Sequence, residues 1–166
     1  MVNKMHCDTY QSPMGTLWLA GEQGILKELS FGMLPGEPAA PGEFDSVKRW
    51  LDAYFRGEPR EPEFPMEPKG TPFQQLVWKL LLEIPFGETR TYGELARQAA
   101  QIMGKEKMSA QAIGQAVHHN PIAILIPCHR VIGAGGKLTG YASGLHRKQW
   151  LLHHEEQNRR ESHAIC

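Results

Sequence analysis

The sequence predicts a mixed α+β protein: a small antiparallel sheet with one helix, followed by a mostly helical domain that contains a helix-turn-helix. Three observations lead to this fold class. Alternating apolar segments separated by turn residues fill the first part of the chain, a proline-rich stretch occupies residues 58–70, and helical periodicity dominates after it. The 166 residues suffice for one ordinary domain or two small ones.

The expected sheet is a three-stranded meander. Its strands are residues 6–11, 16–20 and 25–31, and the turn signals Ser12-Pro13-Met14-Gly15 and Gly21-Glu22-Gln23-Gly24 separate them. Apolar residues then recur between Phe44 and Phe55 at the i, i+3, i+4, i+7 spacing of an amphipathic helix, which Gly57 ends. We expect this helix to cover one face of the sheet.

A domain boundary is expected near residue 70. Prolines at three-residue intervals make residues 58–70 a stiff, extended connection that cannot be helical. The resulting division is an N-terminal domain at residues 1–69 that ends in this linker, a second domain at residues 70–157, and a polar tail at residues 158–166.

Four helices are expected in the second domain. Thr71 caps the first, which has Pro72 at its first position, and the last spans residues 147–156. Between them, residues 92–101 and 110–119 form two short helices with a brief link, the pattern of a helix-turn-helix. Such pairs pack a core more often than they read DNA, so the pattern alone leaves both interpretations open.

The candidate for chemistry is Cys128, in the run Pro-Cys-His-Arg-Val after the apolar segment 122–126. We expect that segment to be a buried strand that ends at Pro127 and holds the thiol at the edge of the core. A thiol attacks as thiolate, so a base is needed, and His129 is adjacent. Neighbouring residues of an extended chain point to opposite sides, which favours a relay through water over direct contact. The alternative is a structural, buried cysteine.

Composition excludes several classes of protein. Cys7, Cys128 and Cys166 are too far apart to suggest a disulfide framework or a zinc knuckle, which fits a reducing cytoplasm, and no segment has the apolar length of a membrane span. The formal net charge is zero, which argues against a strongly electrostatic nucleic-acid binder. Residues 1–69 carry 7 Lys and Arg against 11 Asp and Glu (−4), whereas residues 70–157 carry 9 against 6 (+3), so the second domain is mildly basic.

Three other kinds of site have partial signals in the sequence. Gly135-Gly136-Lys137 lacks the flanking Gly and Ser or Thr of a P-loop. The pairs His118-His119 and His153-His154 point in different directions on a helix and do not chelate a metal together. A cysteine hydrolase remains possible, with Glu155 or Asn120 orienting the imidazole ring.

The sequence resembles a known family at the motifs Asn120-Pro121, Ile126 to Ile132, Gly140-Tyr141, Lys148 to Leu152, and Glu155. These resemble the O6-alkylguanine-DNA alkyltransferases, also called methylated-DNA--protein-cysteine methyltransferases. The agreement covers residues 70–157, with weaker agreement at residues 12–15 and 52–55. The resemblance implies a ribonuclease H-like first domain and a winged-helix-like second domain.

The activity that this resemblance implies is DNA repair by direct reversal. Cys128 takes the alkyl group of O6-alkylguanine, and of O4-alkylthymine, irreversibly and once, while His129 takes the thiol proton through a water and Glu155 orients the imidazole. The expected partner is double-stranded DNA that contains the lesion; no cofactor, metal or membrane is implied. The protein is expected to be a cytoplasmic monomer, associated with the nucleoid in a prokaryote.

The resemblance also implies roles for residues around the thiol. Tyr92 would donate a proton toward N3 of the base, and Asn120 would brace the turn before the cysteine. The base would be bound by Val131, Tyr141, Ala142 and Ser143, and DNA by Thr91, Ala110, Gln111, Gly114 and Arg130. The second helix of the helix-turn-helix would enter the minor groove, and the damaged nucleotide would be flipped out of the duplex.

One position departs from the family pattern. The family commonly has an arginine seventeen residues before the cysteine, which inserts into the base stack, whereas this chain has Gln111. A shorter, uncharged side chain fills the vacated space less well and lacks attraction to the groove. An alternative function is therefore a DNA-binding protein that senses alkyl lesions and has weak transferase activity.

Overall fold

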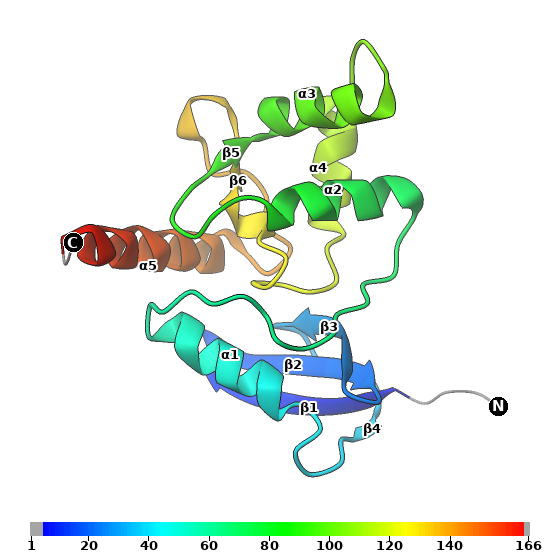
Figure 1. The fold of residues 1–166 in the computed structure, drawn as a ribbon, viewed down its shortest axis with the longest axis vertical. Helices are drawn as coiled ribbons and strands as arrows, with labels where there is room; N and C mark the ends of the chain where they lie inside the picture. The colour runs from blue at the N-terminus through cyan, green and yellow to red at the C-terminus, as the bar shows by residue number, and fades with distance from the viewer. Residues whose placement is uncertain (1–4, 165–166) are drawn as a thin grey trace. The chain divides into compact units, whose positions relative to one another are not determined.

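The computed structural model describes the backbone of residues 5–164 and the side chains of residues 5–159. The fold is mixed α+β, with strands first and helices after them, as predicted (Figure 1). The chain divides into two compact units. One comprises residues up to Lys69 together with Pro121–Ala123, and the other comprises the remainder.

The first unit contains a four-stranded sheet in the order β3-β2-β1-β4. Its strands are β1 (His6–Ser12), β2 (Gly15–Glu22), β3 (Ile25–Ser30) and β4 (Glu37–Pro38). The first three form the expected antiparallel meander. The short β4 was not expected, and it pairs with β1 in parallel. Two residues with no apolar alternation carry no periodic signal, which is why the sequence did not reveal β4.

Helix α1 (Asp45–Phe55) covers one face of this sheet (Figure 1). Its inward residues Val47, Leu51 and Tyr54 are buried with apolar residues of the strands. At the margin, Lys48 Nζ pairs with Asp8 Oδ2 at 2.7 Å, and the Tyr10 hydroxyl donates to Asp52 Oδ1 at 2.6 Å. The meander and helix thus bury one core.

The free side of β3 is covered by two segments that are distant in sequence. Leu26 exchanges backbone hydrogen bonds with the linker, donating to Pro65 O at 3.0 Å and accepting from Glu67 N at 2.8 Å. Leu29 does the same further along, donating to Pro121 O at 2.9 Å and accepting from Ala123 N at 3.0 Å. Residues 121–123 therefore belong to the first unit, although they lie only five residues before Cys128.

The second unit contains four α-helices among its described residues. They are α2 (Pro72–Leu82), α3 (Tyr92–Met103), α4 (Ala110–His118) and α5 (Leu145–Ala164). The short segments are β5 (Arg90–Thr91), η1 (Cys128–Arg130), β6 (Val131–Ile132) and η2 (Ala134–Gly136), of which η1 and η2 are 3-10 turns. Strands β5 and β6 pair in parallel, which places the start of α3 beside the segment that follows Cys128.

Local sequence signals explain where α2 and α3 begin. Thr71 and Gln74 form a reciprocal capping box at α2, with Pro72 at the first position. Thr91 and Glu94 form the same arrangement at α3. The buried Trp78 on α2 then donates its indole N–H to Ala116 O on α4 at 2.9 Å, which links the helix-turn-helix to the first helix of the unit.

Two expectations about the chain after residue 120 were wrong. The apolar run 122–126 is not a strand, because Ile122 forms an isolated β-bridge with Leu29 and the residues after it form turns and a bend, in which Ile124 adopts the left-handed conformation with φ of 70°. A β-branched residue adopts this conformation only when its surroundings impose it. In addition, α5 does not end near Glu156, because it continues to Ala164 through most of the expected polar tail.

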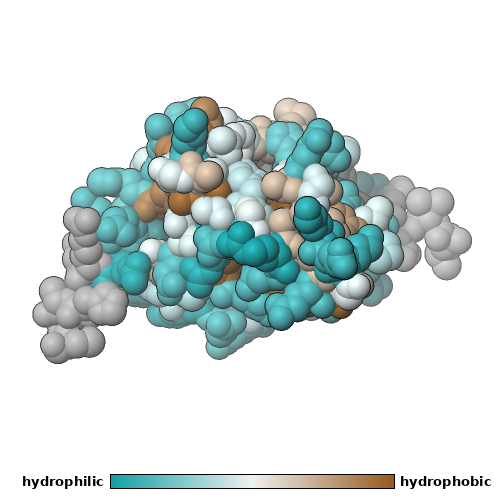
Figure 2. Space-filling model, turned by 90° about the horizontal axis from the view of Figure 1, so that it is seen from above, coloured by the Kyte–Doolittle hydropathy of each residue, from teal (hydrophilic) through white to brown (hydrophobic). Residues whose placement is uncertain are grey.

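The surface of the protein is mixed in character. The face seen in Figure 2 is mainly hydrophilic, with separate hydrophobic patches. None of the helices described within residues 5–164 is long and apolar enough to cross a bilayer.

Candidate active site

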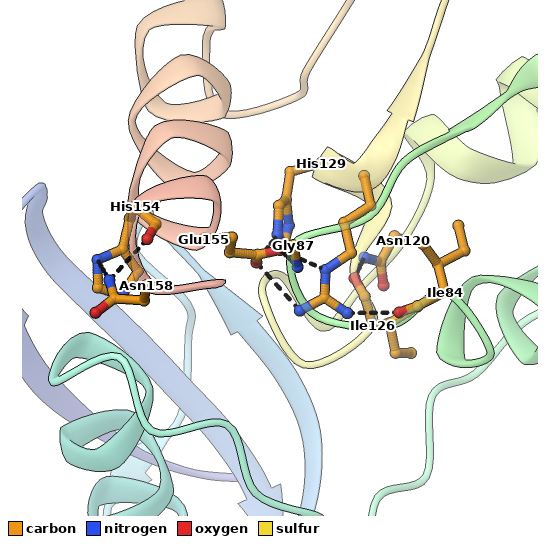
Figure 3. Close-up of polar contacts among 9 residues, drawn as sticks. Ile84, Gly87, Asn120, Ile126, His129, His154, Glu155 and Asn158 are labelled. Atoms are coloured by element: carbon orange, nitrogen blue, oxygen red, sulfur yellow. Dashed lines mark hydrogen bonds and ion pairs between the residues drawn. The ribbon is translucent and has the colours of Figure 1, made fainter. Parts of the chain in front are cut away.

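Cys128 begins the 3-10 turn η1, directly after Pro127. Backbone bonds hold this turn, since Cys128 N donates to Ile126 O at 2.8 Å and Arg130 N donates to Pro127 O at 3.0 Å. Asn120 reaches across from the end of α4, and its Nδ2 donates to Ile126 O at 2.7 Å (Figure 3). Cys128 is thus held by backbone bonds on both sides, and it is buried, with 9% of its surface exposed.

The electrostatic setting of the thiol contains opposing contributions. Burial raises the pKa of Cys128, because it penalises the thiolate, whereas a hydrogen bond from Asn120 and the positive charge of Lys148 lower it. The isolated site thus keeps the thiol protonated more than free cysteine. Ionisation requires a base and the cations nearby.

His129 provides an imidazole that is completely buried. Its Nε2 lies 2.6 Å from Glu155 Oε2, and its Nδ1 has no hydrogen-bond partner among the described residues. A carboxylate can only accept, so Nε2 carries the hydrogen and Nδ1 presents its lone pair. Burial lowers the pKa of His129 against the opposing attraction of Glu155, so the ring is a neutral base.

Glu155 on α5 joins the site to three other groups (Figure 3). Besides His129, its carboxylate accepts from Arg130 Nε at 2.8 Å and Nη2 at 3.1 Å, and from Gly87 N at 3.1 Å. Burial alone raises the pKa of Glu155, but His129 and Arg130 outweigh it and hold the pKa far below the ordinary value. A carboxylate that is only 1% exposed is therefore anionic.

The Arg130 side chain is held inside the unit by several contacts. Besides Glu155, its guanidinium donates to Ile84 O at 2.7 Å, and it lies over the Phe86 ring at 5.8 Å from the centroid. The side chain is 11% exposed. The guanidinium thus fixes Glu155 inside the unit. The DNA contact expected for Arg130 stays a prediction.

The other expected base-binding residues are near the same segment. Tyr92 is the first residue of α3, next to Thr91, whose hydroxyl serves the helix cap. The Tyr141 hydroxyl is buried without a hydrogen-bond partner in the described part of the chain, and burial, with Cys128 nearby, raises its pKa well above the usual value. The Val131 carbonyl accepts from Lys148 Nζ at 2.6 Å, which leaves one lone pair for a ligand.

The expected DNA-binding residues on α4 lie at its first turns. Ser109 caps this helix by accepting from the backbone of Gln111 and Ala112 at 3.1 and 3.2 Å. Ala110 and Gln111 are exposed, and Gly114, one turn later, lies beside the Tyr92 ring. Ala142 is exposed, and the Ser143 carbonyl accepts from Arg147 Nη1 at 2.8 Å.

Two contributions to this site were missed from the sequence. One is Arg130 as the partner of Glu155, and the other is Lys148, which is fully buried. A signal for Lys148 existed. Lys148, Leu151 and Glu155 stand at i, i+3 and i+7 on α5, so an inward-facing Glu155 places Lys148 on the same buried stripe.

The described residues contain no group of three or more His, Cys, Asp or Glu side chains able to hold a metal ion. The site combines a thiol with the neutral imidazole of the next residue, whose Nε2 is fixed by an anionic carboxylate. Such an arrangement can remove a proton from the thiol and generate a nucleophile.

Acid should destabilise this site, and the direction follows from Glu155. Its pKa is lower in the folded chain than in the unfolded chain, so its contribution to stability is complete above about pH 4.3 and is lost as the pH falls below that value. One such group changes the unfolding free energy by up to about 1.4 kcal/mol per pH unit. Urea unfolding between pH 3 and 6 should therefore show a steeper pH dependence for the wild type than for Glu155→Gln; equal slopes would contradict the assignment.

Comparison with known proteins gives the same family as the sequence motifs. The family model for the DNA binding domain of 6-O-methylguanine DNA methyltransferase matches residues 72–157, and that for its ribonuclease-like domain matches residues 5–68. A methylated-DNA--protein-cysteine methyltransferase of Mycobacterium tuberculosis is 47% identical over 158 residues, which are 92% of this chain and 93% of the relative. One from Methanosarcina acetivorans is 46% identical over 155 residues, 89% of this chain and 96% of that protein.

Solved structures agree with these relatives. The crystal structure of the Mycobacterium tuberculosis O6-methylguanine methyltransferase matches with a TM-score of 0.82 at 46% identity, covering 93% of this chain and 94% of the other. A structure of the mycobacterial protein in complex with DNA matches with the same TM-score at 45% identity, covering 92% and 94%. The predicted resemblance is confirmed, and the chain belongs to the 6-O-methylguanine DNA methyltransferase family.

Proposed function

We propose that this protein repairs DNA by transferring the alkyl group of O6-alkylguanine to Cys128, once per molecule and without a cofactor. The observation that carries the proposal is the buried His129–Glu155 pair next to the thiol, in a chain whose relatives are methylated-DNA--protein-cysteine methyltransferases. O4-alkylthymine is the second proposed lesion, since it also carries its alkyl group on an oxygen of the base.

The proposed reaction begins with proton removal. His129 Nδ1 has a free lone pair and takes the thiol proton through a water, and Glu155 stabilises the imidazolium that forms. The Cys128 sulfur then attacks the alkyl carbon as the bond from carbon to O6 breaks. The bonding electrons remain on the guanine, which receives a proton at N3 from the Tyr92 hydroxyl. The product thioether has no easy leaving group, so the cysteine is not regenerated.

The damaged base must leave the duplex to reach the thiol. We propose that the first turns of α4 enter the minor groove, where Ala110 and Gly114 allow close approach to the backbone. The base would then contact Val131 and the segment from Tyr141 to Ser143. A thiol that accepts an alkyl group must stay reduced. This requirement favours the reducing cytoplasm, where the protein would meet the DNA.

The test is mass spectrometry after incubation with a duplex that contains O6-methylguanine. One methyl group, about 14 Da, should appear on the peptide that contains Cys128, in an amount that saturates at one per protein molecule. The peptide with Cys7 serves as the internal control, and it should stay unmodified. An unchanged Cys128 peptide in folded, reduced protein would contradict the proposed function.

Gln111 is predicted to limit repair in duplex DNA. An arginine at this exposed position would fill the space that the flipped base leaves and would interact with the groove. Gln111→Arg should therefore raise the single-turnover rate on duplex substrate on the order of tenfold. Such an increase corresponds to recovering part of the few kcal/mol that unstacking the base costs. The rate on single-stranded substrate should stay the same. Gln98→Arg, which adds the same charge at an exposed position of α3, is the control.

This measurement also separates transfer from lesion sensing. Equal rates for Gln111→Arg and the wild type on both substrates would show that Gln111 does not act in flipping. Binding of the lesion without any transfer to Cys128 would support the sensing alternative, which the complete thiol, imidazole and carboxylate set makes the weaker hypothesis.

A further inference from the structure

Lys148 is a buried cation that takes no part in the steps of the proposed reaction. Its side chain is fully buried on α5, and its Nζ donates to two backbone carbonyls, Val131 O at 2.6 Å and Thr139 O at 2.8 Å. Transfer of an ammonium from water into a protein interior costs several kcal/mol unless an opposite charge or good hydrogen bonds compensate. Two carbonyl dipoles compensate part of that cost.

The charges around Lys148 do not balance while the thiol is neutral. Glu155 is the buried carboxylate of this cluster, and Arg130 neutralises it with two hydrogen bonds. His129 is neutral, because burial lowers its pKa, and Tyr141 is neutral, because burial raises its pKa. Lys148 therefore keeps a positive charge that none of these groups neutralises, and a Cys128 thiolate would place a negative charge in its neighbourhood.

The electrostatics support this pairing in both directions. Burial lowers the pKa of Lys148, and the interaction with Cys128 opposes that shift. Burial raises the pKa of Cys128, and the charge of Lys148, after the Asn120 hydrogen bond, opposes it. The two groups thus stabilise each other only in their ionised forms.

The same side chain also restrains the segment that follows the thiol. Val131 and Thr139 lie at the two ends of residues 131–139, and Gly133 N donates to Lys137 O within this loop at 2.7 Å. Because both ends bond to one ammonium, the loop is tied to α5 about two helical turns before Glu155, on the same buried stripe. Loss of Lys148 therefore has a structural effect as well as an electrostatic one.

We propose that Lys148 is a positioning residue of the acceptor site, whose buried ammonium is the counter-charge of the Cys128 thiolate and whose two carbonyl bonds hold the loop 131–139. The inference deepens the proposed function, since that thiolate is the proposed acceptor. Ionisation of the thiol needs no DNA, so it can be measured independently of repair.

The test is the pH dependence of Cys128 alkylation by iodoacetamide, without DNA, read from the Cys128 peptide. Lys148→Met removes the charge and keeps much of the side-chain volume. We expect the midpoint of its rate profile to rise by at least about one pH unit, with alkylation at pH 7 roughly tenfold slower. Lys137→Met, which removes an exposed ammonium from the same loop, should keep the wild-type midpoint.

A purely structural role would give a different result. If Lys148→Met lowers the melting temperature but leaves the alkylation midpoint unchanged, the counter-charge assignment is overturned. Lys148→Arg adds a second arm, because it keeps the charge and disturbs the fit: its midpoint should stay closer to the wild type than that of Lys148→Met, and equal shifts in both variants would also overturn the assignment.

A measurement on the unsubstituted lysine covers the case in which Lys148→Met does not fold. In a variant whose Cys7 and Cys166 are serine, Lys148 is titrated by NMR of its ε-carbon before and after iodoacetamide converts Cys128 to a neutral thioether. The Lys148 midpoint should fall on modification, since the counter-charge is lost, and an unchanged midpoint would refute the pairing. If Lys148 and Cys128 titrate together but the protein leaves the methyl group on DNA, the proposed function is contradicted and the Lys148 inference is not.

Discussion

Replacement of Cys128 with serine should abolish methyl transfer, with a loss in excess of roughly 10⁴-fold, and should leave the fold intact. A hydroxyl ionises far less readily than a thiol, and oxygen is a poorer nucleophile toward a saturated carbon. The neutral His129 cannot compensate, since its pKa is already lowered by burial. Serine has nearly the size of cysteine, so the turn that begins at Cys128 should form normally.

Single-turnover transfer from an O6-methylguanine duplex measures the loss of transfer in Cys128→Ser. Binding of the same duplex measures the affinity for DNA that this variant keeps. Affinity for the lesion should change little, because the proposed DNA contacts lie on α4 and in the segment from Tyr141 to Ser143. Cys7→Ser is the matched control, since Cys7 is in β1 and its thiol donates to Gly36 O at 3.4 Å. Transfer by Cys128→Ser at a measurable rate, or loss of transfer in Cys7→Ser, would place the acceptor elsewhere.

Much of the fold could be predicted because its signals are local. The turns at Gly15 and Gly24 separate strands whose apolar residues alternate, and the caps at Thr71 and Thr91 begin helices where the sequence indicated. These features depend on residues a few positions apart. Their agreement explains why the α+β class was correct.

The segment before the cysteine shows where such signals fail. The apolar run 122–126 predicted a buried strand, since all five residues favour burial, and they are indeed buried. Their conformation, however, is set by distant partners: Pro121 and Ala123 bond to Leu29, after which Ile124 turns the chain in the left-handed region. Periodicity reports which residues avoid water, and it cannot report which remote backbone they meet.

The same limit applies to the site. The motif identified the thiol and imidazole, but it could not show that Arg130 is turned inward, because an arginine next to the thiol is equally suited to bind phosphate. The decisive facts are contacts across 25 residues to Glu155 and 46 residues to Ile84. A charged residue in a sequence indicates that it will contact an opposite charge or a polar group. Which partner it contacts depends on whether the fold buries the side chain.

Glu155→Gln is expected to have the second largest effect, on stability and on transfer together. The substitution removes the negative charge and leaves Arg130 buried without a counter-charge, which typically costs about 3–5 kcal/mol. It also removes the anion that stabilises the His129 imidazolium, so transfer should slow on the order of 10²-fold or more. Urea unfolding and single-turnover transfer measure the two effects. Glu83→Gln, at an exposed carboxylate that follows α2, should change stability by less than about 0.5 kcal/mol.

The double variant Arg130→Met/Glu155→Gln tests whether this cost is electrostatic. Glu155→Gln leaves the buried charge of Arg130 without a counter-charge. If this causes the loss of stability, adding Arg130→Met should restore part of the stability, since no buried charge then lacks a partner. Transfer should not recover with it, because His129 still lacks its carboxylate. Additive losses in stability would instead mean that packing and the Ile84 hydrogen bond account for the role of Arg130. Recovery of transfer along with stability would mean that His129 does not need an anion at Nε2, which would contradict the proposed relay.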